Sequence, residues 1–148
     1  LYYIQVVDYL NEMAKALVHI TKPAFEHIDN NHKGLSQEQT DDLMQINDDV
    51  AEIYGNINRM ITTNDFSDID MVLTMRDELF ERIATTIKSE IGRINAGESN
   101  AKASMFYLTV LSETKAMVLQ ARNLLKAQRY FLEHAETTKN WAAMNRTK

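Results

Sequence analysis

Pairs of acidic residues spaced four positions apart are the side chains in this sequence best suited to chemistry. On a helix, residues i and i+4 share one face, so two carboxylates could bind a hard divalent cation together. With acids this frequent, about three such pairs are expected by chance, and a solvated charged face is the alternative interpretation. Such pairs include Asp8 with Glu12, Asp48 with Glu52, and Asp77 with Glu81.

The four histidines offer a second kind of chemistry. No two of them show the i,i+4 spacing of helical metal ligands, and the Glu-x-x-His motif of di-iron helical bundles does not occur. We therefore expect them at surface or loop positions. His19 is the candidate in the middle of a helix, so a histidine phosphotransfer bundle is one alternative function. The other histidines are His27, His32 and His134.

Several function classes are disfavoured by what the sequence contains. There is no glycine-rich phosphate loop, no Gly-x-Ser-x-Gly elbow and no cysteine, so we predict that the chain is not an enzyme. Sixteen Lys and Arg against 21 Asp and Glu give a net charge of -5, which argues against nucleic acid as a partner. No run approaches the roughly 18 consecutive apolar residues that a membrane span requires.

The elements that must position these side chains are predicted to be helices. One proline and four glycines among 148 residues leave few points where a helix must end, which favours an all-α fold. Apolar residues with alternating steps of three and four form a seam, which predicts a long helix packed against other helices. The seam contains Leu43, Ile46, Val50, Ile53, Ile57 and Met60.

Similar stripes predict three further helices. We expect helices over residues 2–29, 36–63, 67–94 and 100–133 or beyond. Pro23 should kink or briefly break the first, and Ser36 with Gln39 forms a capping-box pattern that opens the second. The expected seam of the first helix is Val6, Leu10, Met13, Leu17 and Ile20. That of the third is Val72, Met75, Leu79, Ile83, Ile87, Ile91 and Ile94, and that of the fourth runs from Tyr107 to Leu132.

These helices are predicted to form a single domain. Each measures about 40 Å at about 1.5 Å per residue, and helices of equal length joined by short loops run antiparallel to their neighbours. We therefore predict an up-down-up-down four-helix bundle over residues 1–136. The mostly polar residues 137–148 are expected to be a flexible C-terminal tail.

The helix around the first acidic pair resembles the signature helix of the PhoU family, in which an acidic pair at i and i+4 follows an apolar lead-in. Residues 5–17 read Gln-Val-Val-Asp8-Tyr-Leu-Asn-Glu12-Met-Ala-Lys-Ala-Leu. A second copy of the motif is visible in residues 107–117, Tyr-Leu-Thr-Val-Leu-Ser-Glu113-Thr-Lys-Ala-Met117. Its second acid is replaced by Met117.

The chain as a whole resembles the PhoU-like domain at the cytoplasmic C-terminus of bacterial sodium/phosphate cotransporters of the Bacteroides type. Residues 2–10, 19–23 and 25–33 look like the way those domains begin. The resemblance implies a non-catalytic regulatory domain, covalently joined to a transmembrane transporter part at the cytoplasmic side of the inner membrane. The sequence opens in the middle of an amphipathic pattern, so we expect it to be a piece of a longer protein whose transporter part precedes it.

The resemblance also implies a metal site. PhoU proteins bind metal clusters through their acidic motifs, so Asp8, Glu12 and Glu113 are candidate ligands for a divalent or iron-type cation if the first and fourth helices are neighbours. The alternative from another class is a four-helix ligand-sensing domain of a membrane receptor. An exposed apolar flank would allow two bundles to pair as a homodimer.

Overall fold

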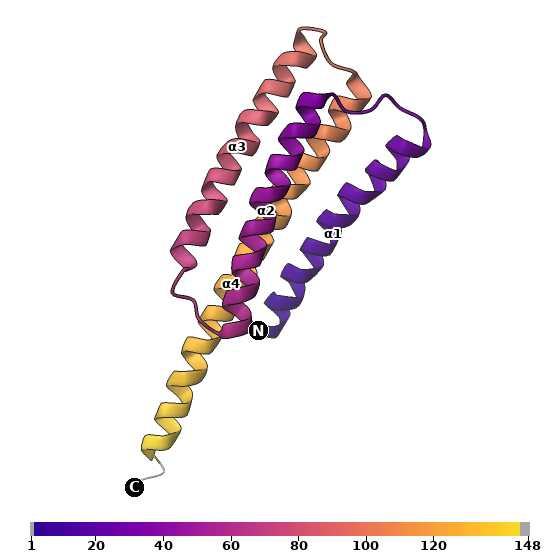
Figure 1. Cartoon of the computed structure of the whole chain (residues 1–148). Helices are drawn as coiled ribbons and strands as arrows, with labels where there is room; N and C mark the ends of the chain where they lie inside the picture. The colour runs from indigo at the N-terminus through magenta and orange to yellow at the C-terminus, as the bar shows by residue number, and fades with distance from the viewer. Residues whose placement is uncertain (1, 146–148) are drawn as a thin grey trace.

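The chain folds into an all-α four-helix bundle, as predicted. The computed structural model describes residues 2–145 and, within them, the side chains of residues 4–139. Successive helices run in opposite directions (Figure 1). Their bounds are α1 Tyr2–Asp29, α2 Gln37–Thr63, α3 Ile69–Asn95 and α4 Ala101–Asn145. Within this described part, no helix is apolar over a length that could cross a membrane.

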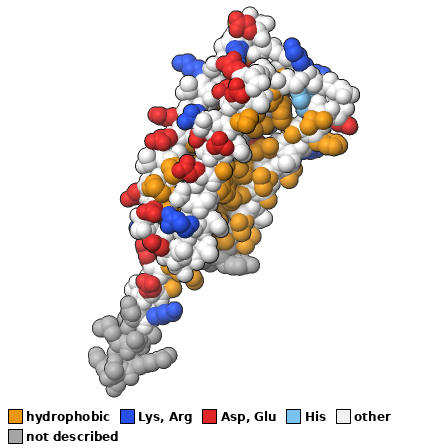
Figure 2. Space-filling model, in the orientation of Figure 1, with side chains coloured by type: hydrophobic (Ala, Val, Ile, Leu, Met, Phe, Trp, Pro, Cys, Tyr) orange, Lys and Arg blue, Asp and Glu red, His pale blue; other side chains and the backbone are white. Residues whose placement is uncertain are grey.

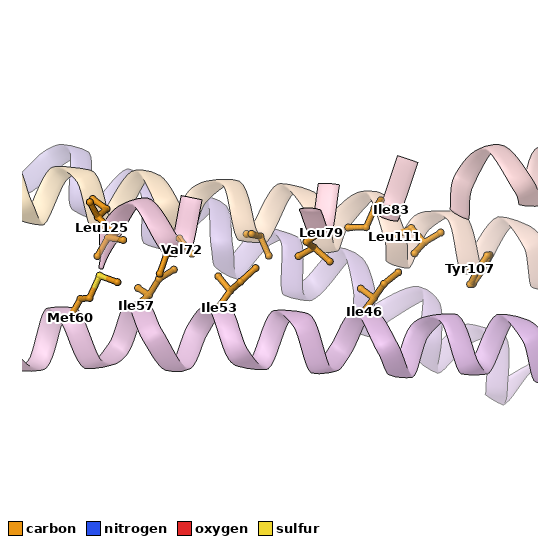
Figure 3. Packing of buried hydrophobic residues seen from close by; sticks show 13 residues of the cluster. Ile46, Ile53, Ile57, Met60, Val72, Leu79, Ile83, Tyr107, Leu111 and Leu125 are labelled. Atoms are coloured by element: carbon orange, nitrogen blue, oxygen red, sulfur yellow. The ribbon is translucent and has the colours of Figure 1, made fainter. Parts of the chain in front are cut away.

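The core lies among α2, α3 and α4, each of which contacts the other two. The predicted seam of α2 is confirmed, since four of its residues are buried and Leu43 and Val50 pack partly buried against the core. In Figure 3 the labelled side chains of α2 point toward those of α3 and α4. The buried apolar side chains include Ile46, Ile53, Ile57, Met60, Val72, Leu79, Ile83, Tyr107, Leu111, Val118, Ala121 and Leu125.

Helix α1 is attached to this core from one side. Among the described helices it contacts α4 alone, and Ala16 is its single fully buried apolar residue. The seam predicted for α1 is therefore partly wrong, because Leu10 and Leu17 are 49% and 50% exposed. A helix with one neighbour buries a narrower strip than a helix with two, and Leu10 and Leu17 lie at the edge of that strip.

Pro23 does not break α1. The helix is continuous from Tyr2 to Asp29 with the proline inside it, so the short break expected there does not occur. Proline removes one backbone hydrogen bond, but the turns on either side keep theirs. The neighbouring Thr21 hydroxyl donates to the Leu17 carbonyl at 2.9 Å, within the same helix.

The last turns of α3 differ from the prediction. Ile91 and Ile94 are 46% and 38% exposed, whereas Glu90 is fully buried. From Ile83 the buried positions advance by seven residues, which leads to Glu90, and Ile91 lies about 100° further round the helix. The apolar pattern therefore predicted burial of Ile91, whereas the buried residue is the adjacent Glu90.

The predicted start of α2 is confirmed, and α4 extends beyond the expected bundle. The capping box is confirmed, since the Ser36 hydroxyl accepts from the Gln39 N–H and the Gln39 side chain accepts from the Ser36 N–H. Helix α4 continues through residues 137–145 and projects beyond the other helices (Figure 1). Residues 146–148 lie outside the described part of the chain, so flexibility there stays a prediction.

Two substitutions on α3 test where the core lies. Ile83→Ala should lower the free energy of unfolding by about 2–5 kcal/mol, because it removes buried methyl groups and leaves a cavity. Ile91→Ala, at a half-exposed position, should cost less than about 1 kcal/mol. Urea denaturation followed by circular dichroism measures both, and equal losses would contradict this placement of the core.

Candidate functional site

The acidic residues predicted from sequence lie on two neighbouring helices, α1 and α4. Asp8 and Glu12 occupy neighbouring turns of α1, and both are exposed. The Glu12 carboxylate accepts from the Lys15 ammonium at 2.7 Å, which is a surface ion pair within one helix. Such a pair holds Glu12 along its own helix rather than toward α4.

Glu113, the acidic residue of the second motif, lies opposite a later part of α1. Its carboxylate is 3.4 Å from Nδ1 of His19, whose side chain is 61% exposed. His19 follows Glu12 by seven residues, or about 10 Å along the helix axis. The structure thus brings the two helices together, which was the condition for the metal site, and places Glu113 about two turns from Glu12 and three from Asp8.

The three carboxylates do not form one cluster in the described part of the chain. Among the residues that the structure describes, no group of three or more His, Asp or Glu side chains converges on a point that could hold a metal ion. Glu12 and Glu113 also have side-chain partners of their own in Lys15 and His19. Metal binding by Asp8, Glu12 and Glu113 stays a prediction, and no step of the function proposed below passes through a metal.

Two other histidines meet where α1 ends. The rings of His27 and His32 are 5.4 Å apart, and the His27 ring stacks on Phe106 of α4 at 5.1 Å. A pocket of about 280 Å³ opens beside them and is also lined by Lys102. Loss of water around His32, the Lys102 charge and His27 all lower the pKa of His32, so its imidazole is neutral at pH 7.

A buried polar cluster, which the sequence did not predict, joins the other three helices at the same end of the bundle. Its centre is the carboxylate of Glu90 on α3, which is fully buried. The Gln39 amide of α2 and the Ser104 hydroxyl of α4 donate to Glu90 Oε1 at 2.9 and 2.5 Å. Gln39 therefore serves both the capping box of α2 and the buried carboxylate.

The second oxygen of Glu90 binds Arg93, one turn further along α3. Arg93 Nε and Nη2 donate to Glu90 Oε2 at 2.9 and 2.5 Å, in a two-pronged contact. The remaining nitrogen, Nη1, pairs with Glu38 on α2. Both oxygens of the buried carboxylate are thus satisfied, and the arginine extends the cluster from the interior to the surface.

The cluster could have been found from the sequence by extending each seam by one step. Gln39 precedes Leu43 by four residues, Glu90 follows Ile87 by three, and Ser104 precedes Tyr107 by three. Each is the next seam position, occupied by a polar residue. Polar residues at matching ends of three seams indicate a buried hydrogen-bonded layer.

The hydrogen bonds decide the charge state of Glu90. Burial alone would raise its pKa, but the donors Ser104, Arg93 and Gln39, together with the arginine charge, outweigh burial and hold the pKa below the ordinary value of 4.5. Glu90 is therefore ionised at neutral pH. A nearby contact repeats the pattern, since the buried Tyr107 hydroxyl donates to Asp42 at 2.8 Å and burial raises the pKa of that tyrosine.

Glu90→Gln should make the contribution of this charge visible as a pH dependence. A lowered folded-state pKa means that the stabilisation is complete above the unfolded pKa, near 4.5, and is lost as the pH falls through the folded value. At pH 7 the variant should be less stable than the wild type by about 1.5–3 kcal/mol, the range for hydrogen bonds to charged groups.

Urea titrations at pH 7 and pH 3 measure the difference, which should shrink at the lower pH. Glu81→Gln, at an exposed position on the same helix, is the matched control and should change little at either pH. A difference between wild type and Glu90→Gln that stays constant with pH would show that Glu90 is not ionised in the folded chain.

The metal prediction has its own test in the purified chain. If Asp8, Glu12 and Glu113 bind a cation, metal analysis should find a stoichiometric divalent or iron-type ion that is lost in Asp8→Ala. Asp77→Ala, in an acidic pair on α3, is the control and should leave the metal content unchanged. A metal-free wild-type chain, or a metal content that Asp8→Ala does not reduce, contradicts the prediction.

Comparisons with known proteins give no further guide to this site. No protein-family model, no curated protein and no solved structure matches the chain. The functional proposal therefore rests on the contacts described above and on the resemblance carried by residues 5–17 and 107–117.

Proposed function

We propose that this chain is a non-enzymatic regulatory module of a sodium-dependent phosphate transporter. In this proposal it is joined to the transmembrane part of the transporter on the cytoplasmic side of the bacterial inner membrane. The resemblance of residues 5–17 and 107–117 to the PhoU signature supports the assignment. Those two segments lie on α1 and α4, which are neighbouring helices.

The attachment of α1 is the observation that carries the regulatory role. Helices α2, α3 and α4 share one core and the buried Glu90 cluster, whereas α1 contacts α4 alone and contributes Ala16 as its fully buried apolar residue. Elements with few buried contacts open or shift at a lower free-energy cost than the core. A module of this kind can change the position of α1 while the remaining helices stay fixed.

The polar contact between α1 and α4 is suited to such a shift. His19 and Glu113 are 3.4 Å apart and partly exposed, with 61% and 26% of their side chains accessible. Even when His19 is protonated, an exposed pair of this kind contributes only about 0–1 kcal/mol, so this contact orients α1 without locking it. In the proposed function, a movement of the transporter part shifts α1 against α4. Conversely, a shift of α1 against α4 changes the activity of the transporter part.

Locking α1 to α4 tests this role in the full transporter. The chain has no cysteine, so His19→Cys with Glu113→Cys introduces one reactive pair, which a short bismaleimide can bridge. If α1 relays regulation, bridging should change the initial rate of sodium-dependent phosphate uptake by on the order of five-fold. The matched control is Asp49→Cys with Arg82→Cys, which bridges an existing 2.9 Å ion pair between α2 and α3.

The two outcomes are separable. An uptake rate that changes with the α1–α4 bridge and not with the α2–α3 bridge supports the proposal, and an unchanged rate with both contradicts it. The coding sequence upstream of Leu1 distinguishes the two proposed classes of protein. An array of membrane-spanning segments there supports a transporter, whereas a single span supports the alternative of a ligand-sensing receptor domain.

A further inference from the structure

A second seam runs along α1, beside the one that meets α4. It advances in alternating steps of three and four residues from Val7 to Ile28, the same repeat that defines the buried seam of α2. Three of its large apolar members are exposed, Leu10 by 49%, Leu17 by 50% and Ile28 by 75%. Its members are Val7, Leu10, Ala14, Leu17, Thr21, Ala24 and Ile28, none of which is charged.

This seam borders an open groove between α1 and α2. The two helices make no contact within the described part of the chain, and an apolar pocket of about 340 Å³ lies between them. Ile20 of α1, Leu43 and Val50 of α2, and Val110 and Met117 of α4 line the pocket, and no charged side chain takes part. The groove thus lies directly beside the projecting side chains of α1.

The charges of both helices lie away from this groove. At about 100° per residue, Asp8, Lys15 and Lys22 fall on the side of α1 opposite the second seam. On α2, Asp42 pairs with Tyr107 of α4 and Asp49 with Arg82 of α3, so these two carboxylates are turned toward α4 and α3. Figure 2 shows the result as a hydrophobic band along the groove, with acidic side chains gathered over α3.

We propose that this uncharged strip is covered by the same strip of a second copy of the chain. Each copy carries a net charge of -5, so pairing through a charged face would be repulsive, and this strip lets two copies meet with their charges turned outward. The strip spans two helices, each about 40 Å long and about 10 Å across, or roughly 800 Å². A standard interface buries about that area on each partner.

The shape of the strip is complementary to itself. A ridge of exposed large side chains on α1 lies beside the α1–α2 groove, so a two-fold axis places the ridge of each copy in the groove of the other. Leu17 lies near the middle of the seam between Val7 and Ile28. With the two-fold axis placed beside this point, Leu17 lies near Leu17 of the second copy. The inference is independent of the transporter assignment, because it uses the surface of the isolated chain alone.

Sedimentation velocity on the purified chain tests the proposal directly. The wild type should sediment as a dimer at micromolar concentrations, and Leu17→Glu should convert it to a monomer with at least a 100-fold weaker dissociation constant. Ile91→Glu is the matched control, because Ile91 is exposed to a similar extent, 46%, on α3, which has no contact with α1. That variant should stay dimeric. Circular dichroism of each protein establishes that the helices are intact.

A single cysteine identifies the face that is buried. Since the chain contains no cysteine, Leu17→Cys should form a disulfide-linked dimer under mild oxidation, and Ile91→Cys should stay unlinked. Three results overturn the proposal: a wild-type monomer up to several hundred micromolar, a dimer that survives Leu17→Glu, or cross-linking through residue 91 in place of residue 17. A monomer that instead binds detergent micelles would assign the strip to an apolar ligand.

Discussion

The buried carboxylate of Glu90 is the constraint on which the arrangement of three helices depends. A charge without access to water is tolerated only when its oxygens are hydrogen-bonded, and here the donors come from α2, α3 and α4. Sliding any of these helices by one turn would separate a donor from the carboxylate. The apolar seams supply most of the burial, but their repeated Leu and Ile residues would accept several registers. The Glu90 cluster selects one of them.

The same cluster explains why α1 stands apart. The polar layer and the apolar core are complete with three helices, since α2, α3 and α4 each contact the other two. Helix α1 then has a single neighbour, α4, and Ala16 is its one fully buried apolar residue in the described part of the chain. The molecule is a three-helix core with a fourth helix added at its side. Helix α1 is therefore joined to the core through α4 alone.

The sequence predicted the helices well because local rules govern them. The repeat from Leu43 to Met60 and the capping box of Ser36 and Gln39 involve residues within one or two turns of each other, and both are confirmed. The errors lie where the outcome depends on other helices. Periodicity predicted Leu10 and Leu17 as core residues because it does not indicate how many helices pack against α1. Ile91 was predicted as a core residue because an isoleucine is normally buried in preference to an adjacent glutamate. Here three helices supply hydrogen-bond donors to Glu90, so the glutamate is buried in its place.

The candidate site shows the same limit. The resemblance placed Asp8, Glu12 and Glu113 on two helices that are indeed neighbours, but it could not specify how far one helix is shifted along the other. That shift sets Glu113 beside His19 rather than Glu12. A similar argument applies to the apolar residues of α1, which cover more than half of its circumference. A helix with one neighbour buries only part of such a surface, and the rest of α1 exposes Leu10, Leu17 and Ile28. An exposed seam with the repeat of a buried one is costly in water unless another surface covers it, so the sequence of α1 is better matched to an assembly than to an isolated bundle.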